Sequence, residues 1–255
     1  MRSKHPVFIK NTGETTFVFR APYTKDELKS LLMLRYRIFR ETKGDWVFCQ
    51  NPYELDIDAY DLRAYHFGLF KCLGDRQICV GHMRLVVSDE RDTYIAPLVR
   101  EIADEIPDIN PAWDTPPQYV LPHFQLIDEK VAWEITEQAA FDNHILIETS
   151  RYCTDTEAQA IAIARFMVSS VVEAAHHYFK NMGRVYVMVH YLHASFYKSY
   201  GFEIVQEIIP KGTDEKYVIL TIAMNNVAEM LLLAKKQPTV PLHRLTFKKD
   251  LDKAA

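Results

Sequence analysis

The pattern of apolar and polar positions is clearest in the middle of the chain, between residues 144 and 202. Residues 145–153 open as a continuous apolar run and end polar, as a buried strand does when it emerges at a functional edge. Apolar residues at helical spacing then continue to about residue 181, and residues 184–190 form a second apolar run. With a short helix at residues 194–200, this pattern predicts a strand–helix–strand crossover. Such a unit brings the polar end of its first strand to an edge where sheets bind ligands.

The residues after the first of these strands predict where the long helix begins. Thr154 and Glu157 have the spacing of a capping box, in which two side chains bond free backbone N–H groups of the first helical turn. We therefore expect the helix to begin here, with Asp155 and Glu157 at its positively polarised end. Gly183 is expected to end it.

The rest of the chain contains further short strands and helices. Strands are predicted at residues 15–20, 65–72, 77–87, 203–209 and 216–224. Helices are predicted at residues 24–41, 98–105, 128–140 and 227–236. This order predicts an α/β (α+β) fold in which helices flank one mixed sheet. We expect a single domain over residues 1–237 and a loosely ordered tail at residues 238–255.

The region 97–143 is the least regular part of the chain. Five prolines are expected to prevent a long helix or strand there: Pro107, Pro111, Pro116, Pro117 and Pro122. We interpret the region as an insertion that covers one end of the sheet. It is the best candidate for a lid or for a wall that selects the substrate.

Composition excludes several classes of protein. A net charge of -4 over 255 residues, without a basic stripe, predicts no nucleic-acid partner. The four cysteines lack the spacing of a metal site, so we expect no bound metal and free thiols in a reducing cytosol. No early stretch has the apolar core of a signal peptide, and no run reaches membrane-spanning length. These features predict a cytoplasmic protein.

A late stretch of the chain resembles a known superfamily. Residues 195–202 read Ser-Phe-Tyr-Lys-Ser-Tyr-Gly-Phe, which looks like the helix-and-turn signature of the GNAT acyltransferases. The resemblance implies a GNAT-like fold, with a central sheet that is splayed open. It also implies that Tyr197 matches the tyrosine that often protonates the leaving thiolate. A tyrosine in an amphipathic helix is also often packed with its hydroxyl at the rim, and this alternative stays open.

A longer series of five motifs runs through the chain: Leu34-Arg35-Tyr36-Arg37-Ile38-Phe39, Lys43-Gly44-Asp45-Trp46, Asp56-Ile57-Asp58-Ala59-Tyr60-Asp61, Gly81-His82-Met83-Arg84-Leu85 and Glu148-Thr149-Ser150-Arg151-Tyr152. Together they resemble acyl-homoserine-lactone (autoinducer) synthases and their relatives, the N-acyl amino acid synthases and exosortase-associated acyltransferases. The motifs occur in family order over roughly residues 16–205. The chain departs from the family by one extra residue before Trp46. It also has Asp56 where Glu is usual, with Glu54 as a substitute.

This resemblance implies an N-acyltransferase without a bound cofactor. Its donor would be a fatty acyl thioester on the phosphopantetheine of an acyl carrier protein, or acyl-CoA, and its acceptor the amine of an amino acid or an amino-acid-derived compound. GNAT acetyltransferases have a Gly-rich turn where this chain has residues 155–159, and that turn cradles the pyrophosphate of coenzyme A. Residues 155–159 contain no glycine and two carboxylates, which would repel a pyrophosphate. We therefore expect acyl carrier protein as donor and partner, in preference to acetyl-CoA.

Glu148 is the candidate for the catalytic base. Aminolysis of a thioester needs a deprotonated amine and donors for the developing oxyanion, and Glu148 would act directly or through water, with Arg151 beside it. The alternative is that Glu148 only pairs with Arg151 or Arg84 and holds the site together.

Other candidates belong to the two substrates. The residues that match the family's amino-substrate side are Arg35, Phe39, Trp46, Asp56, Asp58, Asp61 and Arg84. The residues predicted to contact the acyl donor are Arg84, Ser150, Tyr152 and His190. Each set has a structural alternative. The arginines could pair with the acids of residues 54–61 instead of a substrate carboxylate. The aromatic residues could belong to the core. A histidine at a strand end is commonly a local hydrogen-bond partner.

Two other functions stay open. One is a plain acetyl-CoA-dependent GNAT N-acetyltransferase. The other, from a different class, is a non-catalytic module that binds an acyl chain or its carrier. Glu148 and the arginines at positions 84 and 151 favour an enzyme over this module.

Overall fold

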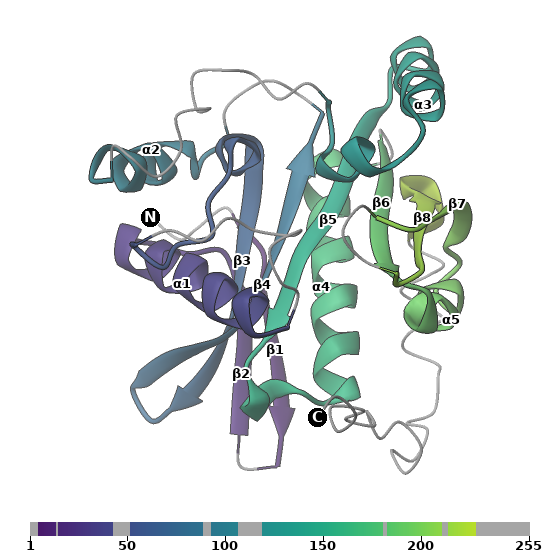
Figure 1. The fold of residues 1–255 in the computed structure, drawn as a ribbon. Coiled ribbons are helices and arrows are strands. Elements are labelled where there is room, and N and C mark those ends of the chain that lie inside the picture. Colours follow the sequence, from purple (N-terminus) through teal and green to yellow (C-terminus); the bar gives the residue numbers. More distant parts are fainter. Residues whose placement is uncertain are drawn as a thin grey trace, which may run out of the picture.

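Among the residues that the structure describes, eight strands form one sheet (Figure 1). The described residues of this computed structural model are 5–13, 15–42, 52–88, 93–106, 119–180, 183–210 and 214–227. The strands are β1 (Val7–Thr12), β2 (Thr15–Arg20), β3 (Ala64–Leu73), β4 (Arg76–Val87), β5 (Ile145–Thr154), β6 (Gly183–His190), β7 (Glu203–Ile208) and β8 (Tyr217–Ala223). They lie in the order β1-β2-β3-β4-β5-β6-β8-β7. Neighbours are antiparallel except for the parallel pair β5 and β6.

The helices of the described part connect these strands. They are α1 (Lys25–Thr42), α2 (Ala96–Asp104), α3 (Glu129–Phe141), α4 (Ile161–Phe179) and α5 (Ala194–Lys198). Short 3-10 turns are η1 (Ala59–Arg63), η3 (Pro122–Leu126), η4 (Thr156–Ala158), η5 (Tyr191–His193) and η6 (Met224–Asn226). Helix α4 joins the parallel strands β5 and β6, which confirms the predicted crossover.

The two faces of the sheet are covered by different helices (Figure 1). Successive residues of a strand point to opposite faces. On β5, Ile147 belongs to the apolar cluster that contains Met167 of α4, whereas Leu146 belongs to the cluster that contains Phe124 of η3. Glu148 is two residues from Leu146, so it points to the face that η1, η3 and α3 cover. The opposite face, under α4, forms the larger core.

The sheet opens between β5 and β6. Their pairing runs from Ile145–Gly183 to Thr149–Val187 and ends there. Beyond this point β5 stays paired with β4 as far as Thr154, and β6 stays paired with β8 as far as His190. The two strands therefore diverge directly after Thr149, which confirms the splayed sheet that was predicted next to Glu148.

A bulge bends β5 inside this opening. Between the pairs Arg84–Ser150 and His82–Cys153, β4 has one residue and β5 has two. Arg151, one of the two, has a φ of 56°. This left-handed conformation is uncommon for a residue with a side chain, because Cβ approaches the following carbonyl oxygen. The bulge shifts the alternation of side chains along the strand, so that Arg151 lies on the same face as Ser150.

The predicted start of the long helix is wrong. Thr154 is the last residue of β5 and pairs with Gly81, so its backbone is extended and continues the strand. The turn η4 follows, and α4 begins at Ile161 with Ala160 as an N-cap residue that has no side-chain hydrogen bond. Asp155 therefore precedes the helix and does not lie in its first turn. The predicted stop is also misplaced, because α4 ends before Lys180 and Gly183 opens β6.

Strand β1 was not predicted. Its apolar residues Val7 and Ile9 are 45% and 64% exposed, so their alternation marks no buried face. The other predicted elements are present, with bounds that differ by a few residues. Of the predicted helix at 227–236 only Val227 lies among the described residues, and the predicted tail at 238–255 lies outside them. No helix in the described part is both long and apolar enough to cross a membrane.

Candidate active site

Glu148 is buried on β5, one residue before the sheet opens, with 3% of its surface exposed. Its Oε2 atom accepts a hydrogen bond from the backbone N–H of His123 at 2.9 Å. The same oxygen lies 2.5 Å from Nδ1 of the His123 ring. The partner of Glu148 among the described residues is therefore His123, whereas the structural alternative named Arg151 or Arg84. That Glu148 only holds the site together is still the alternative to a catalytic role.

His123 was not identified from the sequence. It lies on η3, within the region 97–143 that was interpreted as an insertion, and 2% of its surface is exposed. Among the described residues its second ring nitrogen, Nε2, is buried and has no hydrogen-bond partner. Pro122 at the start of η3 is a signal for a turn, but a single histidine beside it indicates no chemistry. Its importance becomes apparent only in the structure, where it faces the carboxylate of Glu148.

The arginines and aspartates of the motifs form one ion-pair cluster. Arg35 of α1 binds Asp56 through Nε at 2.9 Å and Asp61 through Nη1 at 3.0 Å. Arg84 of β4 binds Asp61 at 2.6 Å and Asp58 at 2.7 Å. The pairing of arginines with the acids of residues 54–61, which the sequence left open, is therefore present. It ties η1 and α1 to the sheet.

Arg151 completes this cluster at its exposed end. Its Nη2 lies 3.2 Å from Asp58 and its Nε 3.5 Å from Asp56. The side chains of Arg151 and Asp58 are 15% and 24% exposed, whereas those of Arg35, Arg84 and Asp61 are at most 1% exposed. A ligand that approaches the cluster therefore meets Arg151 and Asp58 first.

Three arginines and three aspartates balance the charge of this cluster. Burial alone would raise the pKa of Asp58, but Arg84 and Arg151 hold that pKa below its usual range. Burial likewise opposes ionisation of Asp61, and Arg35 and Arg84 keep its pKa well below the usual range. Both carboxylates are thus ionised at neutral pH, each beside a guanidinium.

Two buried histidines extend the cluster under the bulge. Nδ1 of His66 lies 3.2 Å from Nε2 of His82, whose Nδ1 faces the carbonyl oxygen of Arg151 at 3.3 Å. Burial lowers the pKa of His66 to about 4, although Asp61 opposes this shift. Burial also lowers the pKa of His82 well below its usual range. Both rings are therefore neutral at pH 7, and they support the backbone of the bulge.

Two further predicted residues adjoin the cluster. Phe39 is buried, and the guanidinium of Arg151 lies 5.4 Å from the centre of its ring. The Oγ of Ser150 accepts a hydrogen bond from Nε of Arg84 at 3.2 Å. Trp46 lies outside the described residues, so its place in the pocket stays a prediction.

The remaining predicted residues, catalytic Tyr197 and the donor-side residues Tyr152 and His190, have no hydrogen bond or ion pair with Glu148 in the part of the chain that the structure describes. Tyr197 packs in the core under α4, the face opposite to Glu148, and burial raises the pKa of its hydroxyl. Tyr152 is 37% exposed. His190 ends β6, and its Nδ1 accepts a hydrogen bond from the backbone N–H of Leu192 at 3.3 Å. This cap is the local role that was the alternative for His190.

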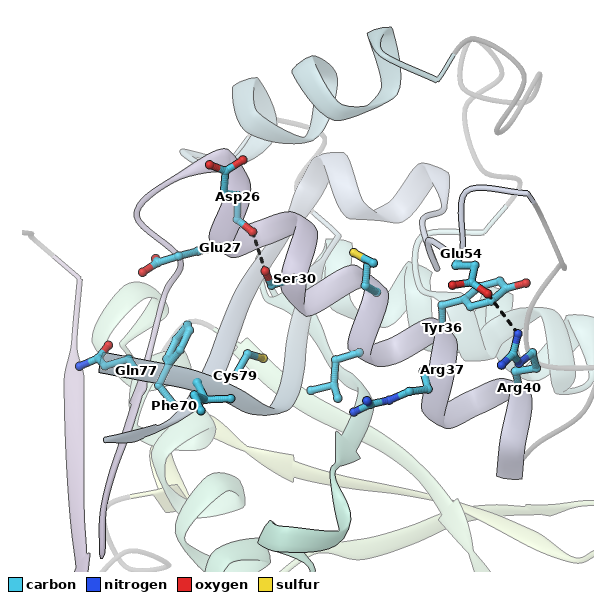
Figure 2. Close-up of a pocket in the computed structure, with 13 residues that line it drawn as sticks. Asp26, Glu27, Ser30, Tyr36, Arg37, Arg40, Glu54, Phe70, Gln77 and Cys79 are labelled. Atoms are coloured by element: carbon cyan, nitrogen blue, oxygen red, sulfur yellow. Dashed lines mark hydrogen bonds and ion pairs between the residues drawn. The ribbon is translucent and has the colours of Figure 1, made fainter. Parts of the chain in front are cut away.

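A groove of about 620 Å³ lies between α1 and the first residues of β4 (Figure 2). Its wall contains Met33, Phe70 and Ile78 among charged side chains, and it includes none of the residues predicted for the active site. Arg37, which lines it, also binds Asp155 at 2.5 Å, and Arg40 binds Glu54 at 3.3 Å. The groove is thus separate from the Glu148–His123 pair.

Neither a family model nor a curated protein matches the chain. Its fold is similar to that of FeeM, an N-acyl amino acid synthase from uncultured soil microbes. The TM-score is 0.54 at 14% identity, and the match covers 87% of this chain and 98% of FeeM. TofI, in a complex with an inhibitor and MTA, matches with a TM-score of 0.49 at 19% identity over 91% of this chain and 97% of TofI. MesI, a CoA-dependent acyl-homoserine lactone synthase, matches with a TM-score of 0.48 at 16% identity over 86% of this chain and 93% of MesI.

The likeness to FeeM is a shared fold. The match covers 87% of this chain and 98% of FeeM, so it extends over the sheet and its flanking helices together. This confirms the predicted GNAT-like fold class. The resemblance that was drawn from five short motifs therefore extends to the three-dimensional structure.

Proposed function

We propose that the chain is an N-acyltransferase that moves a fatty acyl group from a carrier thioester to the amine of an amino acid or an amino-acid-derived acceptor. The observation that carries this proposal is the opening of the sheet directly after Thr149, with the buried Glu148–His123 pair beside it. Diverging strands leave backbone N–H and C=O groups without a partner strand, and a narrow extended arm with amide groups, such as phosphopantetheine, is suited to bond them. The name of FeeM supports an amino acid as acceptor.

The two requirements of thioester aminolysis are matched by groups on this face. The acceptor amine must lose a proton, and the Glu148–His123 pair supplies a buried carboxylate and an imidazole at one point. The oxyanion that develops on the thioester carbonyl needs hydrogen-bond donors, and the bulge around Arg151 offers irregular backbone for this role.

The acceptor is proposed to bind at the exposed end of the ion-pair cluster. Asp58 carries a negative charge that suits a substrate ammonium, and Arg151 carries a planar guanidinium that suits a carboxylate. Arg35 and Arg84 both bond Asp61 in the interior of the cluster, so the proposed role of these three residues is to fix the positions of Asp58 and Arg151. Phe39 and Trp46 remain the proposed walls.

The proposed donor is acyl carrier protein, with acyl-CoA as the second choice. Helix α4 begins at Ile161 after Gln159 and Ala160, without the glycines that let a backbone approach a pyrophosphate closely. The argument from repulsion is weaker than the sequence implied, because Asp155 precedes the helix and is paired with Arg37. The absence of a Gly-rich turn is the feature that supports a carrier protein.

Single-turnover release of free thiol tests this proposal against its two rivals. The donors are a long-chain acyl carrier protein, the acyl-CoA of the same chain length and acetyl-CoA, each with and without a pool of amino acids. Release that depends on amino acids and is fastest from the carrier protein supports the proposal. Fastest release from acetyl-CoA supports an N-acetyltransferase, and the absence of release from all three supports a binding module.

A further inference from the structure

We infer that His123 is the catalytic base of the proposed acyl transfer, and that Glu148 is a positioning residue that acts through it. This inference rests on the proposed function and assigns the proton-accepting atom within it. Glu148 was predicted as the base from its position on the strand alone. The structure adds a second titratable group, from a distant segment, whose free atom is better suited to the task.

The hydrogen bonds of Glu148 define the tautomer of His123. Oε2 of Glu148 accepts from the backbone N–H of His123 and faces Nδ1 of its ring at 2.5 Å. A carboxylate oxygen only accepts hydrogen bonds, so Nδ1 must carry the proton. In the neutral ring, Nε2 then has a lone pair. A carboxylate that fixes one ring nitrogen so that the other can accept a proton is the arrangement of a catalytic Asp–His or Glu–His pair.

Nε2 of His123 is an acceptor without a partner. Only 2% of the surface of His123 is exposed. Among the described residues, no group donates a hydrogen bond to Nε2. Buried polar groups are nearly always hydrogen-bonded, so an orphaned one calls for an explanation. An N–H group of a bound substrate would satisfy it. Oε2 of Glu148, by contrast, already has two donors.

The pair lies where the thioester is proposed to enter. Tyr186 of β6 is the residue that pairs with Glu148 across the sheet, and the centre of its ring lies 5.7 Å from that of His123. The next pair, Thr149–Val187, is the last before β5 and β6 diverge. His123 therefore stands over the last closed pairs of the sheet, on the face that also carries Arg151 and Asp58.

The proposed step is balanced in atoms and charge. The lone pair of the acceptor amine forms the new N–C bond at the thioester carbonyl, and the C–S bond breaks with its electron pair on sulfur. The proton that the amine nitrogen loses goes to Nε2 of His123, and the carboxylate of Glu148 stabilises the imidazolium that forms. Nε2 of His123 then gives this proton to the leaving thiolate. Amine and thioester thus give amide and thiol, and the ring returns to its initial state.

His123→Asn separates the base from its structural role. The amide nitrogen of asparagine occupies a position similar to Nδ1 and still donates to Glu148, but no atom replaces Nε2. We expect the single-turnover rate of amino-acid-dependent thiol release to fall about 10²- to 10⁴-fold. The affinity for acyl donor should be unchanged, the pH dependence of the rate should lose one ionisation, and added imidazole should partly restore the rate of His123→Gly. His144→Asn, which changes an exposed histidine just before β5, is the matched control and should behave as wild type.

The outcomes separate the inference from the proposed function. Wild-type protein that releases no thiol contradicts the proposed function. If the wild type is active and His123→Asn has the same rate and the same pH profile, the inference is contradicted while the proposed function is not. Nitrogen NMR of labelled histidine gives a readout that does not need activity. At mildly alkaline pH we expect His123 to carry its proton on Nδ1, and a proton on Nε2 would overturn the inference.

Discussion

At the scale of single residues, the chemistry depends on partners that the sequence does not place together. Glu148 was found because it belongs to a motif at the polar end of a strand. His123 was not, because it lies 25 positions away in a proline-rich segment whose path no periodicity predicts. The same holds for the buried histidines at positions 66 and 82, which look like ordinary strand residues until the pairing of β3 with β4 brings them together.

Glu148→Gln should lower the rate of the chemical step by about 10²-fold or more and leave donor binding unchanged. The amide oxygen still accepts a hydrogen bond from His123, but the neutral side chain no longer stabilises an imidazolium. Single-turnover rates and a separate binding measurement with an unreactive donor analogue check this prediction. Equal losses in rate and in binding would make Glu148 a scaffold residue.

His66 makes the stability of the protein depend on pH. Burial lowers the pKa of His66 from 6.5 to about 4, so the unfolded state takes up a proton between these values and the folded state does not. The contribution to stability is therefore complete above pH 6.5 and is lost as the pH falls to about 4, by about 3 kcal/mol.

In His66→Gln the titrating group is gone, while the amide can still bond His82 and lie beside Asp61. The free energy of unfolding in urea should fall less in this variant than in wild type between pH 6.5 and 4. His144→Gln is the control, since an exposed histidine should leave the wild-type profile unchanged. Parallel profiles for wild type and His66→Gln would contradict the buried neutral ring.

At the scale of elements, one sequence pattern has different outcomes at two places in the chain. Thr24 and Glu27 have the Thr-x-x-Glu spacing, and Oγ1 of Thr24 does accept the N–H of Glu27 at the start of α1. Thr154 and Glu157 have the same spacing, but Thr154 is held in β5 by its pairing with Gly81. Local propensity decides where no neighbouring strand competes, and tertiary pairing decides where one does.

The ion-pair cluster should contribute strongly to the attachment of α1 and η1 to the sheet. Arg35→Met removes a fully buried charge and leaves Asp56 and Asp61 without it, so we expect a loss of about 3–5 kcal/mol in the free energy of unfolding. Arg40→Met, on the same helix, removes a side chain that is 46% exposed and should cost less than about 1 kcal/mol. Urea unfolding of both variants measures the difference, and equal costs would contradict the role of the cluster.

The bulge in β5 was not predictable, because arginine has no preference for a left-handed backbone. The φ of 56° at Arg151 is imposed by the register between β4 and β5. Arg151→Gly and Arg151→Ala both remove the guanidinium, but only glycine adopts this φ without strain. Arg151→Gly should therefore be more stable than Arg151→Ala by about 1 kcal/mol in urea unfolding. A more stable alanine variant would contradict the left-handed backbone at Arg151.

At the scale of the whole molecule, the order of strands and helices was the most predictable feature. Runs such as residues 145–153 and 184–190 are long and apolar enough to define buried strands, and the helix between them makes their pairing parallel. The opening of the sheet was expected from the resemblance and not from the pattern, since the point at which two strands part leaves no mark on either sequence. Residues of η3 and α3 cover this face. The interpretation of the region 97–143 as an insertion that acts as a lid stays a prediction.

The most direct test of acyl transfer is the product itself. Purified protein is incubated with a long-chain acyl carrier protein and a pool of amino acids, and the mixture is analysed by high-resolution mass spectrometry beside a thiol assay. An acyl chain joined to an amino acid through an amide, formed in equal amount to the free thiol of the carrier, is the predicted result. An unchanged thioester, or free fatty acid and thiol without any amide, would contradict it.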